Sequence, residues 1–205
     1  MSKTFCLALT GASGVQYGLR LLQLLLAADC RVYLMLSKAA EVVIRRETSL
    51  VVPENLAEQQ AWFRDTYAAT EDQLQLFGRE DWFAPVASGS GAPEAMVICP
   101  ASGGTLSALA NGASNNLIER AGDVALKERR KLILVPRETP YSQVHLENML
   151  KLTQMGALIL PASPGFYQNP QTLEDLVDFV VARILDHLAV PQTLIPVWGD
   201  QPTTK

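Results

Sequence analysis

A short glycine-rich segment, Gly11-Ala-Ser-Gly14, follows directly after an apolar run near the start of the chain. Its glycines permit a tight turn between a strand and a helix, and free N–H groups at the start of that helix can bind a phosphate. The Ser13 hydroxyl adds another donor. Turns of this composition also occur without any ligand. We interpret the segment as a site for a phosphorylated cofactor.

The residues around this turn argue against a nicotinamide dinucleotide. The dinucleotide fingerprint has a third glycine three residues after Gly14, where this chain has Tyr17. It also has an acidic residue after the second strand, where this chain has Ser37 and Lys38. None of the five tyrosines is followed by lysine four residues later, as a short-chain dehydrogenase would require. Ser37 and Lys38 are better suited to hydrogen-bonding an anion or the edge of a flavin.

A second turn of small residues, Pro100-Ala-Ser-Gly-Gly-Thr105, precedes another predicted helix. Backbone and hydroxyl groups in such a turn can approach a ligand closely. Ser102 is the expected helix N-cap, and a capped helix alone would also explain the segment. Two such turns after neighbouring strands would flank one crevice.

Basic side chains recur where they could gather around an anion. Arg120 and Lys127 are seven residues apart on one predicted helix, so two turns, or ~10.5 Å, separate them on the same face. Arg137 directly follows a predicted strand, where open α/β sheets place ligand contacts. Tyr167 follows another strand, and Arg183 interrupts the apolar face of the last helix. A solvated basic face and a structural salt bridge are the alternative interpretations.

The histidines and cysteines do not form a metal-binding pattern. His145 and His187 share no ligand spacing with each other or with a cysteine, so we expect no catalytic metal and place them on a helix surface and a helix end. Cys6, Cys30 and Cys99 are an odd number with no close pair. Reduced core thiols of this kind predict a cytoplasmic protein.

Hydrophobic periodicity predicts strands that alternate with helices. Strands are expected at 4–10, 31–36, 95–99, 132–136 and 157–160, and helices at 13–28, 39–46, 54–67, 102–110, 115–130, 142–154 and 173–188. This alternation predicts an α/β domain with a doubly wound parallel sheet, whose ligands bind at the carboxyl ends of the strands. We expect one domain over 1–190 and a tail over 191–205. The Gly/Ser/Pro-rich stretch 85–93 is either a surface connection or a binding loop.

The overall composition limits the partners. The 205 residues suit a single domain, and 48% are hydrophobic, enough for a sheet buried on both faces. A net charge of −4 gives no basic field to hold a nucleic acid or an anionic membrane. We also expect no export signal and no membrane span, because no basic leader and no apolar run of ~18 to 20 residues is present.

Seven motifs spread over almost the whole chain carry a family resemblance. They are Thr10-Gly-Ala-Ser-Gly14, Ser37-Lys-Ala-Ala40, Glu47-Thr48, Cys99-Pro100, Glu119-Arg-Ala-Gly-Asp-Val-Ala-Leu-Lys-Glu-Arg-Arg130, Pro136-Arg-Glu-Thr-Pro140 and Pro164-Gly-Phe-Tyr167. Together they resemble the UbiX-like flavin prenyltransferases. The segment 120–130 and the pair Arg137-Glu138 are the most specific, because they combine unusual charged residues at fixed spacing.

The resemblance implies a Rossmann-like, flavodoxin-like fold and a homododecamer with sites at subunit interfaces. It implies a metal-independent transfer of a dimethylallyl group from dimethylallyl monophosphate to N5 and C6 of reduced FMN. The prenylated FMN would serve a UbiD-type decarboxylase, often in ubiquinone biosynthesis. The flavin and aromatic faces such as Trp82 or Trp198 would steady the allyl cation.

The same resemblance implies roles for individual residues. Flavin contacts are expected from Gly11, Ala12, Ser13, Ser37, Ser102, Thr105 and Arg137. Dimethylallyl phosphate contacts are expected from Arg120, Lys127, Tyr167 and Arg183, and catalytic roles from Ser13, Glu47, Lys127 and Glu138. The cations would stabilise the departing phosphate. As a hypothesis on proton transfer, Glu47, Ser13 and the departing phosphate are the candidate relays for the proton lost at ring closure, and Glu138 is the candidate donor to the phosphate.

Two alternatives remain open at this point. A flavin-dependent cysteine decarboxylase of the same fold has a Pro-Ala-Ser-Ala-Asn-Thr motif similar to Pro100–Thr105. Its asparagine is Gly104 here, however, and the first 144 residues lack the catalytic histidine of those enzymes. The other alternative is a non-catalytic FMN-binding protein, in which the basic residues form only a structural network.

Overall fold

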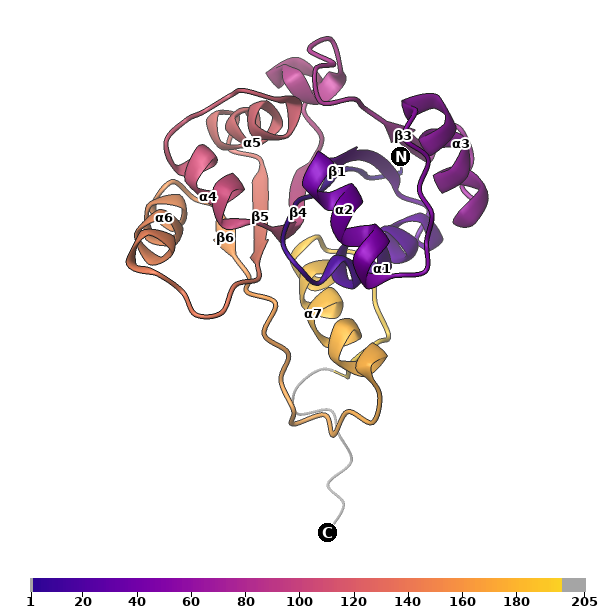
Figure 1. Cartoon of the computed structure of the whole chain (residues 1–205), viewed down its shortest axis with the longest axis vertical. Coiled ribbons are helices and arrows are strands. Elements are labelled where there is room, and N and C mark those ends of the chain that lie inside the picture. Colours follow the sequence, from indigo (N-terminus) through magenta and orange to yellow (C-terminus); the bar gives the residue numbers. More distant parts are fainter. Residues whose placement is uncertain (1, 197–205) are drawn as a thin grey trace.

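A parallel sheet forms the centre of the computed structural model, which describes residues 2–196. Within these residues six strands pair in the order β3-β2-β1-β4-β5-β6 (Figure 1). They are β1 (Thr4–Leu9), β2 (Arg31–Leu36), β3 (Leu74–Leu76), β4 (Ala95–Ala101), β5 (Lys131–Pro136) and β6 (Leu158–Ile159), and every pairing is parallel. Without the short β3 this is the flavodoxin-like order, so the predicted doubly wound α/β fold is confirmed.

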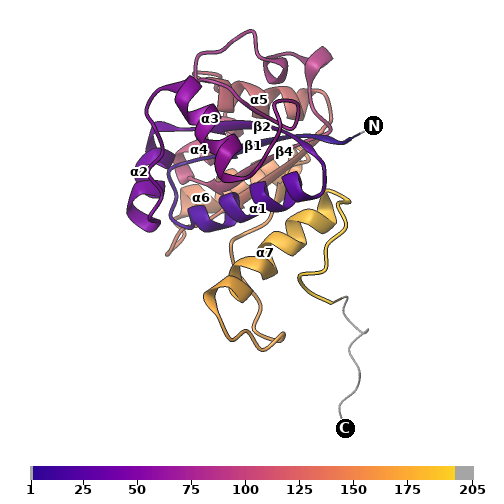
Figure 2. The same cartoon turned by 90° about the vertical axis from the view of Figure 1, so that its right-hand side faces the viewer.

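Helices cover both faces of the sheet (Figure 2). They are α1 (Val15–Ala27), α2 (Lys38–Glu47), α3 (Leu56–Thr66), α4 (Gly103–Ala110), α5 (Leu117–Lys127), α6 (Gln143–Gln154) and α7 (Leu173–His187), with short 3₁₀ helices η1 (Pro85–Ala87) and η2 (Gly89–Gly91). Helices α1 and α7 share one core with the sheet, and α4 and α5 share the other. Both layers are apolar.

Strand β1 lies at the centre of the sheet and is covered by a helix layer on each face. Its alternate residues Phe5, Leu7 and Leu9 belong to the core beneath α1 and α7, whereas Cys6 and Ala8 belong to the core beneath α4 and α5. Successive side chains of a strand point to opposite faces, so a central strand covered on both sides must be apolar throughout. The unbroken run of apolar residues is the sequence signature of that position.

Helix α1 begins two residues later than expected because of its entry turn. Gly14 is its N-cap and has a φ of 97°, in the left-handed region that favours glycine. One turn further, Gly18 packs against β4, where an added Cβ would lie 2.2 Å from the carbonyl oxygen of Cys99. The helix therefore lies directly on the sheet at this point.

The largest difference from the predicted elements is β3, which was not expected. Leu74–Leu76 contains three residues, too few to show the alternation by which a strand is recognised. It is held by pairing with β2, a contact between segments about forty residues apart in the chain. The stretch 85–93 is also more regular than expected, since it contains η1 and η2.

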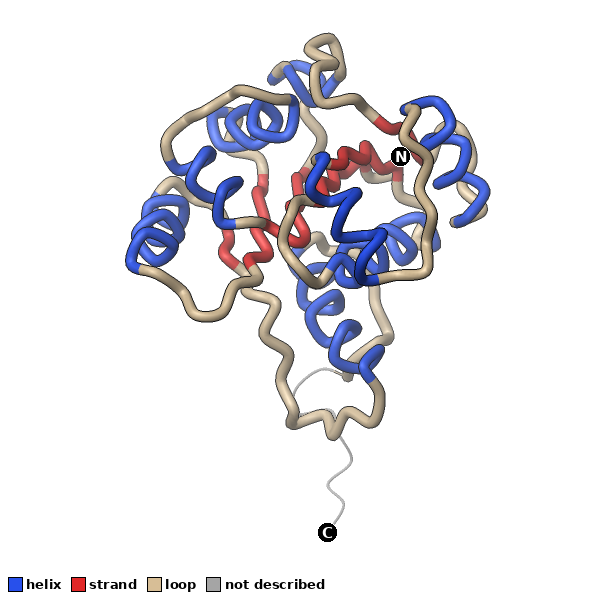
Figure 3. The backbone as a smooth tube through the Cα atoms, viewed as in Figure 1, coloured by secondary structure: helices blue, strands red, loops and turns tan. Residues whose placement is uncertain are grey.

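Long loops join the last elements (Figure 3), including the connection from β6 to α7. Residues 191–196 of the expected tail lie beside α7, and Leu194 packs against the core. Residues 197–205, and with them Trp198, lie outside the described residues, and the domain boundary at 190 stays a prediction. Among residues 2–196, no helix has the length and apolar character that crossing a membrane would require.

Candidate functional site

Three of the predicted turns meet at the carboxyl edge of the sheet. The turn 10–14 follows β1, Ser37 follows β2, and the turn 102–105 follows β4. Strand β1 pairs with both β2 and β4, and the order of the strands reverses between β1 and β4. Ligands of open α/β sheets bind at this reversal point. The structure brings the predicted cofactor residues to this edge, and we call the place where the three turns meet the crevice.

Glu47 occupies part of the turn after β1. Its Oε2 accepts the N–H groups of Gly14 at 2.8 Å and Val15 at 3.2 Å, and its carboxylate also binds the Ser13 hydroxyl. The expectation that the N–H groups at the start of α1 are free is therefore wrong for these two residues. A carboxylate from the end of α2 already lies where we expected an external anion.

The charge of Glu47 is stabilised by this position. Partial burial alone would raise its pKa, but the bonds from Ser13, Gly14 and Val15, with the nearby Arg137, outweigh burial and lower the pKa below its usual value. Glu47 is therefore ionised at neutral pH. Arg137 also donates from Nε to the carbonyl oxygen of Ser13 at 3.2 Å, which links the end of β5 to the same turn.

The turn after β4 forms the opposite side of the crevice. Ser102 caps α4, accepting the N–H of Thr105 at 3.3 Å, and the hydroxyls of Ser102 and Thr105 lie 3.0 Å apart. Within residues 2–196, the N–H groups of Gly103 and Gly104 have no hydrogen-bond partner. The expected N-cap is confirmed, and the turn presents unused donors.

Ser37, after β2, belongs to the third turn of the crevice. Its Oγ accepts the N–H of Ala40 at 3.0 Å as the cap of α2, and its own N–H donates to the carbonyl of Leu9 at 3.0 Å. Among the residues that the structure describes, no group accepts the hydroxyl proton of Ser37, which is therefore available as a donor. The capping bond thus fixes the side chain without consuming its hydrogen.

The donors of the crevice suit the phosphate of a group such as FMN. The unused N–H groups of Gly103 and Gly104 and the hydroxyls of Ser102 and Thr105 are donors of the kind that bind phosphate. A Cβ added at Gly104 would meet no atom within 4 Å, so the space beside Gly104 is open, whereas one added at Gly103 would lie 2.8 Å from Nε2 of His145. Cations are also present, because Arg137 reaches the crevice from β5.

The remaining predicted cations lie elsewhere in the single chain. Arg120 donates to Asp123 at 2.9 Å and to the carbonyl of Ala87 in η1 at 3.0 Å. Lys127, at the end of α5, pairs with Glu128. Helix α5 leads into the amino end of β5, whereas Arg137 follows its carboxyl end.

Arg183 also lies toward the amino edge of the sheet. It pairs with Asp186 at 2.6 Å and helps lower the pKa of His187, after burial of that imidazole. The carbonyl of His187 accepts a hydrogen bond from Lys131, the first residue of β5. The six residues of β5 span roughly 16 Å, so one chain does not bring Arg183 and Arg137 together.

Tyr167 and Glu138 lie in the loops after β6 and β5. The Tyr167 ring is half exposed and packs edge-on against Phe179 of α7, with 5.5 Å between ring centroids. Glu138 accepts the N–H of Thr139 at 3.2 Å, and its charge, after burial, raises the pKa of Tyr141. Glu138 thus lies one residue beyond Arg137 at the carboxyl edge of the sheet.

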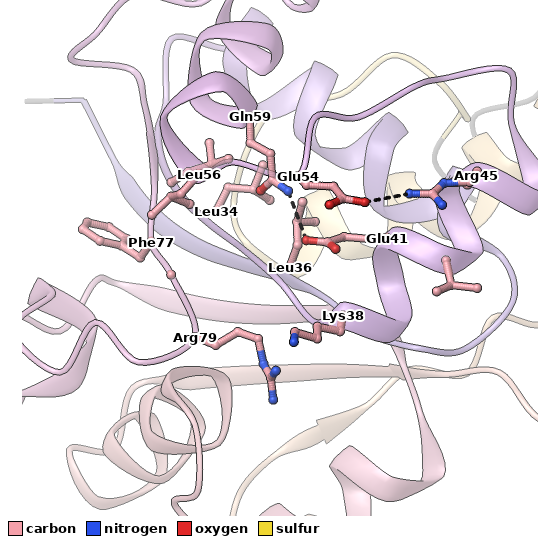
Figure 4. A pocket seen from close by; sticks show the side chains of 13 residues that line it. Leu34, Leu36, Lys38, Glu41, Arg45, Glu54, Leu56, Gln59, Phe77 and Arg79 are labelled. Atoms are coloured by element: carbon pink, nitrogen blue, oxygen red, sulfur yellow. Dashed lines mark hydrogen bonds and ion pairs between the residues drawn. The ribbon is translucent and has the colours of Figure 1, made fainter.

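One cavity of the described part of the chain contains none of the residues assigned to the flavin or to the dimethylallyl phosphate. It has a volume of about 600 Å³ and lies between α2, α3 and β3. Figure 4 shows Glu41 bonded to Gln59 on one side, while Lys38 and Arg79 lie on the other. Two residues of its lining, Leu36 and Lys38, flank Ser37 in the chain.

The histidines have structural positions. His187 is the last residue of α7, as expected, and His145 lies in the first turn of α6, where its Nδ1 accepts the N–H of Ser142 at 3.2 Å. Within the described residues, no three His, Cys, Asp or Glu side chains are grouped in a way that could hold a metal ion. The three cysteines are buried and unpaired.

Sequence comparisons identify the family to which this chain belongs. The family model described as Flavoprotein matches residues 1–185. A protein of Pseudomonas aeruginosa named flavin prenyltransferase UbiX is 60% identical over 195 residues, covering 95% of this chain and 93% of its own length.

Solved structures agree with this assignment. A UbiX protein, AnUbiX, in complex with FMN and dimethylallyl pyrophosphate has a TM-score of 0.87 and 36% identity, covering 98% of this chain and all of its own. A dodecameric FMN-dependent UbiX-like decarboxylase of Escherichia coli O157:H7 has a TM-score of 0.81 and 37% identity, covering 92% of this chain and 96% of its own. The chain therefore belongs to the flavoprotein family and, within it, to the UbiX flavin prenyltransferases.

Proposed function

We propose that this protein transfers a dimethylallyl group from dimethylallyl monophosphate to N5 and C6 of reduced FMN. The observation that carries the proposal is the meeting of three donor-bearing turns with Arg137 at the reversal point of a flavodoxin-like sheet. Membership of the UbiX flavin prenyltransferases supports the chemistry. A cysteine decarboxylase is not favoured, since relatives 60% and 45% identical to this chain are named as flavin prenyltransferases.

The residues of the crevice would hold the flavin. These residues are Gly11, Ala12, Ser13, Ser37, Ser102, Thr105 and Arg137. Bound FMN supplies the two ring atoms that accept the dimethylallyl group. The backbone donors at the start of α4 suit its phosphate, because helix N-termini favour anions.

Glu47 is suited to accept a proton rather than to donate one. Its lowered pKa keeps it ionised at neutral pH, and its bond to Ser13 connects it to the turn that faces the crevice. We assign Glu47 and Ser13 to the proton relay that ring closure requires. Glu138, one residue beyond Arg137, is assigned to the departing phosphate, to which it would donate a proton.

The dimethylallyl phosphate site would be completed by another copy of the chain. Arg120, Lys127, Tyr167 and Arg183 are the residues assigned to it, and in one chain the last of these lies across the sheet from Arg137. Each of the three cations pairs with a nearby acid and keeps a third to a half of its side chain exposed, so it can reach an approaching phosphate.

The dodecameric relative supports such an assembly. Guanidinium and ammonium groups around the ester would stabilise the charge that develops as its allylic C–O bond breaks. We further propose that the product serves a UbiD-type decarboxylase in the cytoplasm, with ubiquinone biosynthesis as the pathway.

Incubation of the purified protein with reduced FMN and dimethylallyl monophosphate tests the proposal. Mass analysis of the extracted flavin should show one added five-carbon unit. Unmodified flavin together with tight FMN binding would instead favour a non-catalytic FMN-binding protein. Omitting the phosphate ester is the control, and dimethylallyl pyrophosphate in its place tests the donor preference.

A further inference from the structure

Thr10 lies between the two turns of the flavin crevice and is almost completely buried, with 2% of its surface exposed. Its Oγ1 donates to the carbonyl oxygen of Pro100 at 2.8 Å and accepts the N–H of Ser102 at 2.8 Å. Its backbone N–H donates to the same Pro100 carbonyl at 3.2 Å. A buried hydroxyl thus uses its donor and one acceptor position to hold a single neighbouring segment.

That segment is the point at which β4 leaves the regular ladder. The pairing of β1 with β4 ends at Ala8 and Ile98, and the register between β4 and β5 shifts between Ile98 and Ala101. An irregular strand leaves backbone groups without ladder partners, and buried groups of this kind must find others. The hydroxyl of Thr10 supplies the partner of the Ser102 N–H, and it gives a second donor to the Pro100 carbonyl, which also accepts the backbone N–H of Thr10.

The consequence reaches the residues assigned to the flavin. Ser102 caps α4 and lies beside Thr105, so fixing the N–H of Ser102 fixes where the donors of that turn point. Gly11 follows Thr10 directly, and the N–H of Ser37 donates to Leu9, its preceding residue. All three turns of the crevice are therefore tied to Leu9 and Thr10.

We infer that Thr10 is a positioning residue for the flavin, setting the turn 102–105 at a fixed distance from the turn 11–13 through its hydroxyl group. The inference rests on the proposed function, because it concerns the same crevice. Position 10 requires a short side chain with one atom that both donates and accepts a hydrogen bond. Among the natural side chains, only those of serine and threonine meet this requirement.

Binding of FMN to three forms of the protein tests the inference. Thr10→Val keeps the shape of the side chain and removes the hydroxyl, and it should raise the dissociation constant for FMN about tenfold, as expected for losing a buried hydrogen-bond pair. Thr10→Ser keeps the hydroxyl and should stay within about twofold of the wild type. Flavin fluorescence quenching measures the affinity, and the visible spectrum of bound FMN reports its surroundings.

A matched control separates positioning from general stability. Thr153→Val removes a hydroxyl that donates to the carbonyl of Met149 at 2.8 Å on the exposed side of α6, and it should leave the FMN affinity unchanged. Melting of each variant without FMN shows how much stability each change removes. Wild-type affinity in Thr10→Val would overturn the inference. So would a Thr10→Ser variant that binds FMN tenfold more weakly, which keeps the test decisive if Thr10→Val does not fold.

The two proposals fail in different ways. If the wild type prenylates FMN and Thr10→Val binds FMN normally, only the role of Thr10 is refuted. If Thr10→Val weakens binding and Thr10→Ser restores it while the wild type returns unmodified flavin, the positioning role stands and prenyl transfer is refuted.

Discussion

Replacing Glu47 by glutamine would test the ionised carboxylate at the start of α1. The side chain accepts N–H groups from Gly14 and Val15 and the hydroxyl of Ser13. A negative charge at a helix N-terminus contributes about 0.3 to 1 kcal/mol, and a hydrogen bond to a charged group exceeds a neutral one by roughly 1 kcal/mol. Because Glu47 is only partly buried, we expect Glu47→Gln to lower the free energy of unfolding by about 1 to 2 kcal/mol at pH 7.

The pH dependence of this difference has a definite sign. The pKa of Glu47 is lowered in the folded protein, relative to about 4.3 for an unfolded glutamate. Its stabilisation is therefore fully present above the unfolded pKa and is lost as the pH falls through the lower folded pKa. The difference in the free energy of unfolding between wild type and variant should be constant near neutral pH and should disappear below about pH 4.

Urea unfolding at one fixed protein concentration would measure both effects. Glu54→Gln is the matched control, because Glu54 is almost fully exposed and contacts Arg45 at only 4.0 Å, so its loss should cost less than about 0.5 kcal/mol. An equal loss of stability in both variants, or a difference that is the same well below about pH 4 as at pH 7, would refute the argument. Glu47→Gln should also slow the formation of ring-closed prenylated FMN, and a normal rate would remove Glu47 from the proton relay.

Three further predictions concern packing, an ion pair and assembly. Gly18→Ala should cost roughly 1 to 3 kcal/mol in urea unfolding, since the new methyl group would lie 2.2 Å from a carbonyl oxygen of β4, and an unchanged stability would contradict the close packing of α1 on the sheet. Arg20 and Asp178 join α1 to α7 through two bonds of 2.7 and 3.0 Å, and a double-mutant cycle to alanine should give a coupling of about 0.5 to 1 kcal/mol that falls with added salt. Arg137→Ala and Arg183→Ala chains should each be inactive alone and regain activity when mixed in one assembly, and failure to complement would place both side chains in a site from one chain.

The sequence predicts the regular elements well where burial is uniform. The expected strand 31–36 matches β2, and the expected strand at 132–136 differs from β5 by one residue. An apolar run bounded by turn residues is a local signal, because a strand buried on both faces can tolerate little else. Strand β3 could not be predicted this way, since Leu74–Leu76 is held by pairing with β2.

On its own, the sequence established the alternation of strands and helices, the glycine turns and the Ser102 cap, which predict the α/β fold class and place the proposed ligand at the carboxyl edge of the sheet. Tertiary structure alone decided which groups remain free there. Glu47 comes from another helix to occupy two N–H groups of the first turn, and the hydroxyl of Thr10 holds the irregular end of β4. The tertiary structure also placed Arg183 and Arg137 at opposite edges of the sheet. Hydrogen bonds between distant residues and separations across a sheet depend on how the chain folds in three dimensions, and a local sequence pattern contains no information on those distances.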